Sequence, residues 1–106
     1  LTVDHALYQE EKEKESQISI YPNPFGSSLR IVWDQDSDGI TSLEIFDVAG
    51  NKIRKILDGQ TIDAGRQVFY WNGFDGSGRK CKDGVYFIVL KNNEYRHTRK
   101  VLLIKK

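Results

Sequence analysis

Turn-forming residues divide the chain from residue 17 onward into short apolar segments, and this division limits what the chain can fold into. Clusters of glycine, aspartate, asparagine and proline recur at intervals of about 8 to 15 residues, which leaves no stretch with the period of an amphipathic helix. Several segments instead alternate apolar and polar side chains, as a half-buried strand does. The pattern predicts seven strands, at Gln17–Tyr21, Leu29–Trp33, Leu43–Val48, Lys52–Leu57, Gln67–Trp71, Val85–Leu90 and Tyr95–Ile104.

Seven short strands with no helix between them are typical of an antiparallel β-sandwich of immunoglobulin-like type. The chain has 106 residues, enough for one domain with one modest core. Its longest unbroken apolar run is the six residues of Val85–Leu90, too short to cross a membrane as a helix. The continuity of this run predicts a central strand that is covered on both faces. We therefore expect an all-β fold with no membrane span.

The aromatic residues of the predicted strands allow two interpretations. Aromatic side chains in a row on an exposed sheet face can stack on sugars, whereas the same residues facing inward fill the core of a small domain. Core packing is the commoner role, and we expect Trp33, Phe46, Phe87 and Val89 to be largely buried. The aromatic residues in question are Trp33, Phe46, Phe69, Trp71, Tyr86 and Phe87.

Charge is distributed unevenly along the chain, although the net charge is only +1. Residues 1–16 hold five acidic and two basic residues, a net of −3, whereas residues 91–106 hold six basic residues against Glu94, a net of +5. The mixed run Glu10–Glu15 has no apolar face, so we interpret residues 1–16 as a charged linker or the end of a preceding domain, and residues 17–106 as the folded domain. The low net charge gives no support for nucleic-acid binding.

Three aspartates, Asp34, Asp36 and Asp38, stand at alternate positions, as in the first half of a calcium-binding loop. Carboxylates with this spacing can point at one hard cation. The twelfth position counted from Asp34 is Ile45, however, where such a loop requires a bidentate glutamate. The alternative is a polar hairpin loop between two strands, and we expect no required metal ion at this position.

Cys81 is the one cysteine of the chain, which excludes an intrachain disulfide and a cysteine-rich zinc site. The basic residues around it favour a reactive thiolate, but its position just before a predicted strand favours a small buried side chain. Neither of the two histidines lies in a recognisable signature with a serine or cysteine nucleophile. We expect neither catalysis nor a cofactor.

Three blocks of sequence, taken in order, resemble a known family. They are Tyr21–Phe25, Leu43–Ile53 and Trp71–Phe87, and the closing stretch Thr98–Lys105 follows them. Together they resemble the C-terminal sorting domains of cargo proteins of the type IX, or Por, secretion system, and the third block is also similar to the Ig-like domain of the flagellar hook-capping protein. The motif positions with a mainly structural role are Tyr21, Pro22, Asn23, Pro24, Phe25, Gly50, Gly84 and Tyr86.

Conformational preferences explain several of these motif positions. Pro22 and Pro24 have a fixed φ and no N–H donor, so we expect them to stiffen the chain and to end strand pairing. Gly50 is expected to supply the positive φ of a hairpin turn, and Gly84 to let the chain turn into the central strand.

The resemblance implies a non-catalytic sandwich at the end of a large secreted protein of a Gram-negative bacterium. From the periplasm, the outer-membrane secretion translocon would recognise the folded domain and carry the upstream cargo domain across. A sortase-like surface peptidase would then remove the domain, which leaves the cargo secreted or attached to the cell surface. The exposed last strand is the most plausible recognition surface because of its basic residues, Arg99, Lys100, Lys105 and Lys106.

The alternative function is an Ig-like carbohydrate-binding or spacer module attached to a secreted hydrolase. Exposure of Trp33, Tyr70 and Trp71 on one face would favour this alternative, and burial of both tryptophans would oppose it.

Overall fold

The computed structural model describes residues 18–105, which fold into an all-β domain. The interpretation of residues 1–16, and the position of Lys106, therefore lie outside the described residues. All seven predicted strands are present. None of the described residues forms a helix long and apolar enough to span a membrane. The strands are β1 (Ile18–Tyr21), β2 (Leu29–Gln35), β3 (Gly39–Asp47), β4 (Lys52–Ile62), β5 (Gly65–Trp71), β6 (Gly84–Lys91) and β7 (Arg96–Leu103).

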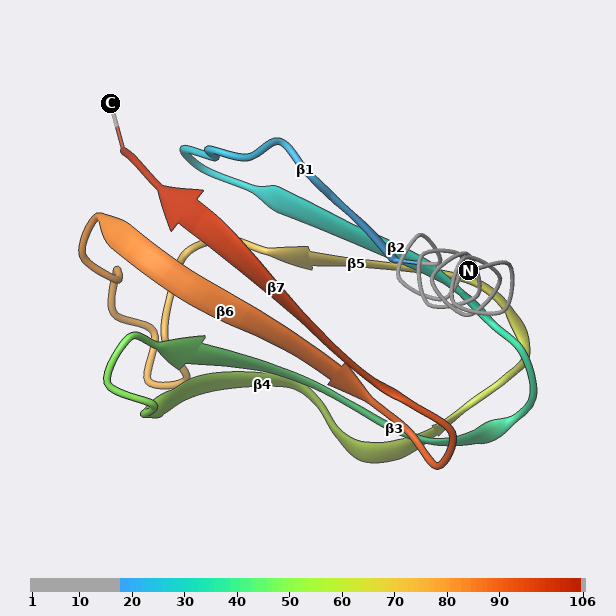
Figure 1. Ribbon diagram of the computed structural model, residues 1–106. Coiled ribbons are helices and arrows are strands. Elements are labelled where there is room, and N and C mark those ends of the chain that lie inside the picture. The colour runs from blue at the N-terminus through green and yellow to red at the C-terminus, as the bar shows by residue number, and fades with distance from the viewer. Residues whose placement is uncertain (1–17, 106) are drawn as a thin grey trace, which may run out of the picture.

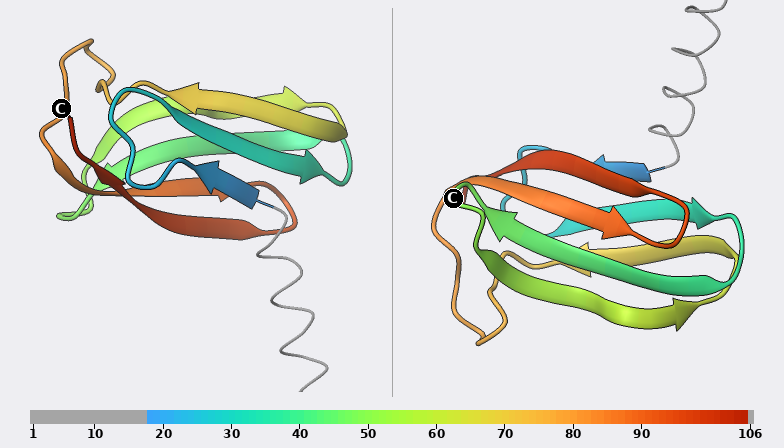
Figure 2. Two further views of the ribbon diagram at one scale, coloured as in Figure 1. Left: turned by 90° about the horizontal axis from the view of Figure 1, so that it is seen from above. Right: turned by 60° about the horizontal axis from the view of Figure 1, so that its bottom comes forward.

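The strands form two sheets that pack face to face (Figure 2). One sheet has the order β1-β2-β5, the other has the order β4-β3-β6-β7, and all neighbouring strands are antiparallel. The apolar run forms β6, which is central in the second sheet, as predicted. The right-hand view of Figure 2 shows the outer face of this sheet, and no other described element lies over it. The expectation that β6 is covered on both faces is therefore wrong for the described part of the chain.

The core between the two sheets has both tryptophans at its centre. Trp33 is 1% exposed and Trp71 is fully buried. The Trp71 ring lies 5.3 Å from the rings of Phe25 and Tyr86, and Trp33 stacks on Phe69 at 5.4 Å. The core role predicted for the tryptophans is thus confirmed. The aliphatic residues that surround them include Leu29, Ile31, Leu43, Ile45, Ile88, Leu90, Val101 and Leu103.

Phe46 and Phe87 lie on the outer face of the four-stranded sheet and are only half-buried, so the prediction that they belong to the core is wrong. Their chain neighbours Ile45 and Ile88 point inward instead and are fully buried. Successive side chains of a strand point to opposite faces. In a continuous apolar run the sequence does not show which of the two sets faces inward. Val89 is buried as predicted, but its side chain points to the outer face of the sheet, as that of Phe87 does.

The hairpin between β3 and β4 forms where the Gly50-Asn51 pair predicted it. Gly50 has a φ of 87°, a conformation that a residue with a side chain rarely adopts. The Asp47 carboxylate accepts the backbone N–H groups of Ala49 and Asn51 at 3.0 and 2.9 Å. These bonds hold the pKa of Asp47 below its ordinary value, with the Asn51 backbone as the largest cause. The predicted role of Gly50 is therefore confirmed.

The connection between β2 and β3 crosses from one sheet to the other, so the predicted hairpin between these strands is wrong. Gln35 ends β2 and is buried; it accepts a hydrogen bond from the Trp33 indole N–H at 2.9 Å. Its side-chain amide donates to the Thr41 hydroxyl of β3, also at 2.9 Å. Because buried polar groups need partners, this chain of bonds ties the two sheets together at the crossing.

Candidate functional site

The blocks of sequence that carry the family resemblance meet at one end of the sandwich, where β7 finishes (Figure 1). Phe25 in the β1–β2 loop forms a parallel bridge with Leu103. In the β5–β6 loop, the N–H of Gly76 donates to the carbonyl of Ile53, just after the β3–β4 turn, at 2.8 Å. We call this region the terminal face; it comprises residues 22–28, 47–53, 72–83 and 103–105.

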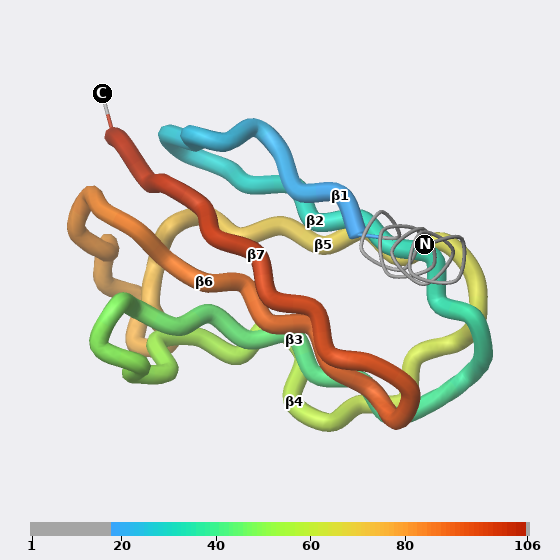
Figure 3. The backbone as a smooth tube through the Cα atoms, viewed as in Figure 1, coloured from blue at the N-terminus to red at the C-terminus, as the bar shows by residue number. Residues whose placement is uncertain are grey.

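The loop after β1 is fastened to the end of β7, and the two segments run side by side (Figure 3). The Asn23 side chain donates to the Lys100 carbonyl at 3.2 Å and accepts the Leu102 N–H at 2.9 Å. The Phe25 N–H donates to the Leu102 carbonyl at 2.9 Å, and the Phe25 carbonyl accepts the Ile104 N–H at the same distance. β7 is an edge strand, so these bonds occupy backbone groups that a further strand would otherwise pair with.

The two prolines of the motif flank Asn23 and shape this attachment. β1 ends at Tyr21, directly before Pro22, which confirms the prediction that the prolines end strand pairing. The peptide bonds before Pro22 and Pro24 are both cis. Phe25 follows and is 1% exposed, so it closes the core beneath the end of β7.

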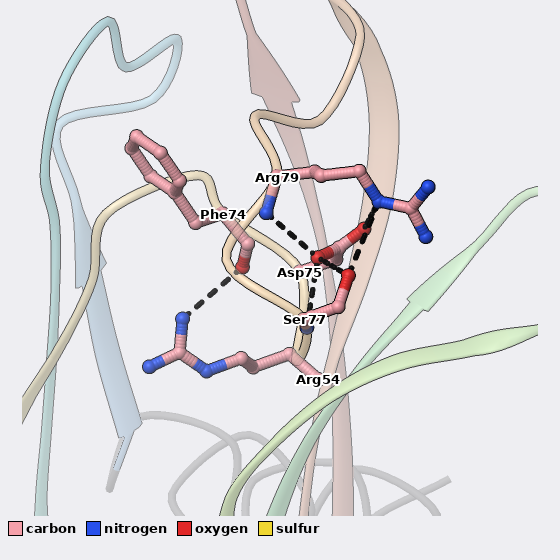
Figure 4. A network of polar contacts seen from close by, with 5 residues as sticks. All are labelled: Arg54, Phe74, Asp75, Ser77 and Arg79. Atoms are coloured by element: carbon pink, nitrogen blue, oxygen red, sulfur yellow. Dashed lines mark hydrogen bonds and ion pairs between the residues drawn. The ribbon is translucent and has the colours of Figure 1, made fainter.

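Asp75 organises the β5–β6 loop through one carboxylate oxygen (Figure 4). This Oδ1 accepts the backbone N–H of Ser77 at 2.9 Å, the Ser77 hydroxyl at 2.8 Å and the backbone N–H of Arg79 at 3.0 Å. The Arg79 guanidinium lies 3.8 Å from the other carboxylate oxygen. These bonds lower the pKa of Asp75; the Arg79 backbone bond is the largest cause, and burial opposes it. The carboxylate is used to hold the turn.

Arg54 and Trp71 anchor the same loop from below. The carbonyl of Phe74 accepts a hydrogen bond from the Arg54 guanidinium at 3.2 Å and from the Trp71 indole N–H at 2.9 Å. Arg54 also donates to the side-chain oxygen of Asn72 at 3.3 Å. The loop therefore has a fixed shape although it contains several glycines.

Cys81 is buried at the end of the loop, 9% exposed, as the small-side-chain interpretation predicts. Burial and the nearby Asp75 raise the pKa of its thiol, which opposes formation of the reactive thiolate. Tyr86 packs beside it, and its hydroxyl donates to the Lys82 carbonyl at 2.6 Å. These residues stabilise the fold.

A groove of about 490 Å³ opens on the terminal face. It is lined by the buried Gly73 and Leu103 and by the more exposed Phe74, Lys80 and Lys105. Gly73 has a φ of 80° and packs against the Leu103 side chain. A Cβ atom added at Gly73 would lie 3.6 Å from both terminal methyl groups of Leu103. The groove therefore forms where the blocks that carry the family resemblance converge.

The four basic residues predicted to form the recognition surface lie at separate places. Lys100 is exposed on the outer face of β7, whereas Arg99 is half-buried on the opposite face, because successive residues of a strand alternate. Lys105 reaches back to the β5–β6 loop, where its ammonium donates to the Cys81 carbonyl and lies 3.8 Å from Asp83. Lys106 lies outside the described residues. The structure does not gather these side chains into one cluster among the described residues.

The three aspartates of the possible calcium loop are exposed and do not converge. Asp34 belongs to β2, where it pairs with Arg66 of β5. The carboxylate of Asp38 accepts the backbone N–H of Ala64 at 2.7 Å, which joins two loops at the far end of the sandwich. The described residues contain no group of three or more acidic, histidine or cysteine side chains that could hold a metal ion.

Acid is expected to weaken the β5–β6 loop through Asp75. The pKa of Asp75 lies below its ordinary value of 3.8 in the folded chain, so the stability that it adds is complete at higher pH and is lost as the pH falls through the folded pKa. We expect Asp75→Asn to lower the melting temperature at neutral pH and to reduce its fall on acidification. Melting curves between about pH 6 and pH 2 test this.

Asp58→Asn is the matched control for this prediction, because it removes one exposed carboxylate whose partner is Lys55 at 3.6 Å. A decline on acidification that is the same in wild type, Asp75→Asn and Asp58→Asn would contradict the proposed role of Asp75.

The local sequence indicates only part of how the terminal face is held together. The Asp75-Gly76-Ser77-Gly78 run carries a local signal, since an aspartate that accepts nearby backbone N–H groups is common in turns. Arg54 has no such signal, because its partners lie 18 and 20 residues away. The contact of Asn23 with β7 spans 77 residues and depends on the complete fold.

Comparison with solved structures supports the sandwich architecture. PorU from Porphyromonas gingivalis, described as latent and dimeric, matches with a TM-score of 0.64 and 17% identity over 84% of this chain and 9% of its own. PorZ from the same organism, described as an essential surface component of the type-IX secretion system, matches with a TM-score of 0.60 and 16% identity over 85% of this chain and 12% of its own.

FlgD from Xanthomonas campestris, whose structure is described as giving insight into the hook capping essential for flagellar assembly, has a TM-score of 0.53 and 22% identity over 83% of this chain and 62% of its own. At these identities the likeness establishes the fold alone. The chain thus spans only a small part of the two Porphyromonas proteins and less than two thirds of FlgD.

Comparison by sequence identifies the family. Comparison with curated proteins gave no match. The model of the secretion system C-terminal sorting domain, however, matches residues 19–105, which include all three motif blocks and nearly every described residue. The chain therefore belongs to the family of C-terminal sorting domains of the type IX secretion system.

Proposed function

We propose that this domain is the non-catalytic signal by which the type IX translocon recognises an upstream cargo domain and carries it from the periplasm across the outer membrane. A sortase-like surface peptidase then removes the domain, and the cargo stays at the cell surface or is released. Residues 1–16 serve as the linker between cargo and signal. The observation that carries this proposal is the family match over residues 19–105.

The way β7 is built into the domain supports recognition of the folded state. Val101 and Leu103 are each 1% exposed, and Asn23 and Phe25 cover the edge of the strand next to them. A receptor that reads a loose terminal peptide would first have to break these contacts. A receptor that reads the folded terminal face finds it already formed, which lowers the entropy cost of binding.

The carbohydrate-binding alternative loses the feature that would have favoured it. Both tryptophans are in the core, and only Tyr70, 58% exposed, remains on a surface from the three residues proposed to stack on sugar. A single exposed tyrosine gives no platform of the kind that aromatic sugar sites use.

Loss of three terminal positive charges is expected to block export while the fold survives. In a reporter fusion behind a signal peptide, the variant Lys100→Gln/Lys105→Gln/Lys106→Gln should lower surface-exposed reporter by about tenfold or more, since an acidic receptor site would lose its charged partners. Its unfolding free energy should stay within about 1 kcal/mol of wild type, because exposed ion pairs contribute little. Protease accessibility of the reporter on intact cells measures export.

A control variant, Arg30→Gln/Lys55→Gln/Arg66→Gln, removes the same charge from positions outside the terminal face and should be exported normally. Normal export of the terminal variant would show that these charges are not recognised and that the end of the chain matters for folding alone.

A further inference from the structure

No described element lies over the outer face of the four-stranded sheet (Figure 2, right). The strand register places apolar side chains on this face. Phe46 of β3 and Phe87 of β6 are directly paired in the register, and both are half-buried. Val89 lies beside Phe87 on the same face, and Val48, 73% exposed, continues the patch beyond the end of β3. A strand as apolar as β6 is usually covered on both faces. Of its outward side chains, Val89 is 3% exposed, whereas Phe87 stays partly uncovered within the described residues.

Positive charge surrounds this apolar centre. The strand register places Lys52 next to Phe46 and Lys100 next to Phe87, so a lysine stands at each end of the phenylalanine row. The Lys52 ammonium lies 5.7 Å from the centre of the Phe46 ring. Arg96 and Lys91, which are partners in the strand register, add two further cations along the same face.

Two carboxylates offset part of this charge. Asp47 lines the same depression as Phe46, and its carboxylate accepts the backbone N–H groups of Ala49 and Asn51. Glu44 is 3% exposed and lies 2.9 Å from the Lys52 ammonium and 3.4 Å from that of Lys91. Burial raises the pKa of Glu44, but its hydrogen bond with Lys52 and the charge of Lys91 together hold the pKa below its ordinary value. Glu44 is therefore an anion already shared by two lysines. Arg96 and Lys100 have no ion-pair partner among the described residues, so their charges are available to bind an anionic ligand.

We propose that this outer face, formed by Phe46, Val48, Phe87, Val89, Arg96 and Lys100, is a docking surface for an acidic protein surface with an apolar centre. The face has a shallow depression of about 410 Å³ between the phenylalanines and Arg96. An apolar centre with a charged rim is the usual anatomy of a protein interface. A second copy of the chain is disfavoured, because it would bring two basic faces together. The proposal rests on the proposed function for the identity of the partner, a component of the outer-membrane translocon.

The test uses the double variant Arg96→Glu/Phe87→Gln, which leaves Lys100, Lys105 and Lys106 intact. Its control is Arg66→Glu/Tyr70→Gln, the same change of charge with loss of an aromatic ring on the outer face of the other sheet. In a type IX-competent host, export of the reporter should fall by about tenfold or more for the first variant and stay near wild type for the control. Both purified chains should unfold cooperatively, which separates docking from folding.

Binding of the purified chain to isolated outer membranes of the same host identifies the kind of partner. We expect binding that weakens with salt, is lost in the double variant, and disappears when the membranes are treated with protease. Binding that survives protease treatment would assign the face to an anionic lipid or polysaccharide, and self-association abolished by the variant in sedimentation would assign it to a second copy. Either result overturns the proposal, as does normal export of the folded double variant. Failure of the wild-type chain to be exported would instead contradict the proposed function, on which the partner depends.

Discussion

Deletion of residues 100–106 is expected to unfold the domain and to abolish export of an attached reporter. The deletion removes Val101 and Leu103, both 1% exposed, and full burial of an aliphatic side chain is worth about 1.5 to 3 kcal/mol. It also leaves the Asn23 side chain and the Phe25 backbone without the groups to which they are bonded. A loss of this size is comparable with the total stability of a small domain, about 5 to 15 kcal/mol.

Circular dichroism with urea titration measures the effect of the deletion. Thr98→Ala, an exposed change in the same strand, is the control and should alter stability by no more than about 0.5 kcal/mol. Cooperative unfolding of the deleted chain at nearly the wild-type urea midpoint would mean that β7 is not part of the stabilising core.

Phe25→Ala is expected to be the most damaging single substitution in the motif, with a cost of about 3 to 5 kcal/mol. The ring is 1% exposed and packs 5.3 Å from the Trp71 ring, so its loss leaves a cavity beneath the terminal face. Urea unfolding of the purified chain measures this cost. The control is Tyr70→Ala, which removes an exposed aromatic ring and should change the free energy of unfolding by no more than about 1 kcal/mol. Equal costs for the two variants would contradict the role assigned to Phe25.

The number and order of the strands could be predicted because turn chemistry and the two-residue period are local signals. The ends were less predictable. β4 runs to Ile62, five residues beyond the predicted end at Leu57, because the ladder continues past Gly59 through an irregularity in its pairing with β3. Gly59 has a φ of 64°. Because glycine is disfavoured inside strands, its presence in the sequence predicts that the strand ends before it.

Local signals do not reveal which face of a strand is buried. The apolar pairs Ile45-Phe46 and Phe87-Ile88 satisfy the pattern in either direction, and only the packing of the second sheet selects the isoleucines for the core. The terminal face depends in the same way on contacts between distant residues. The motif residues were found in the sequence, but the attachment of Asn23 to β7 required the fold.

If this domain is a type IX sorting signal, the location of a reporter fused to the full chain depends on the translocon. The fusion carries a signal peptide and is expressed in a type IX-competent host and in an otherwise identical strain that lacks the translocon. We expect the reporter to be accessible to external protease, or released to the medium, only in the competent strain, and to remain in the periplasm in the other. A folded fusion that stays in the periplasm of both strains, or that reaches the surface of both, would contradict the assignment of this domain as a type IX sorting signal.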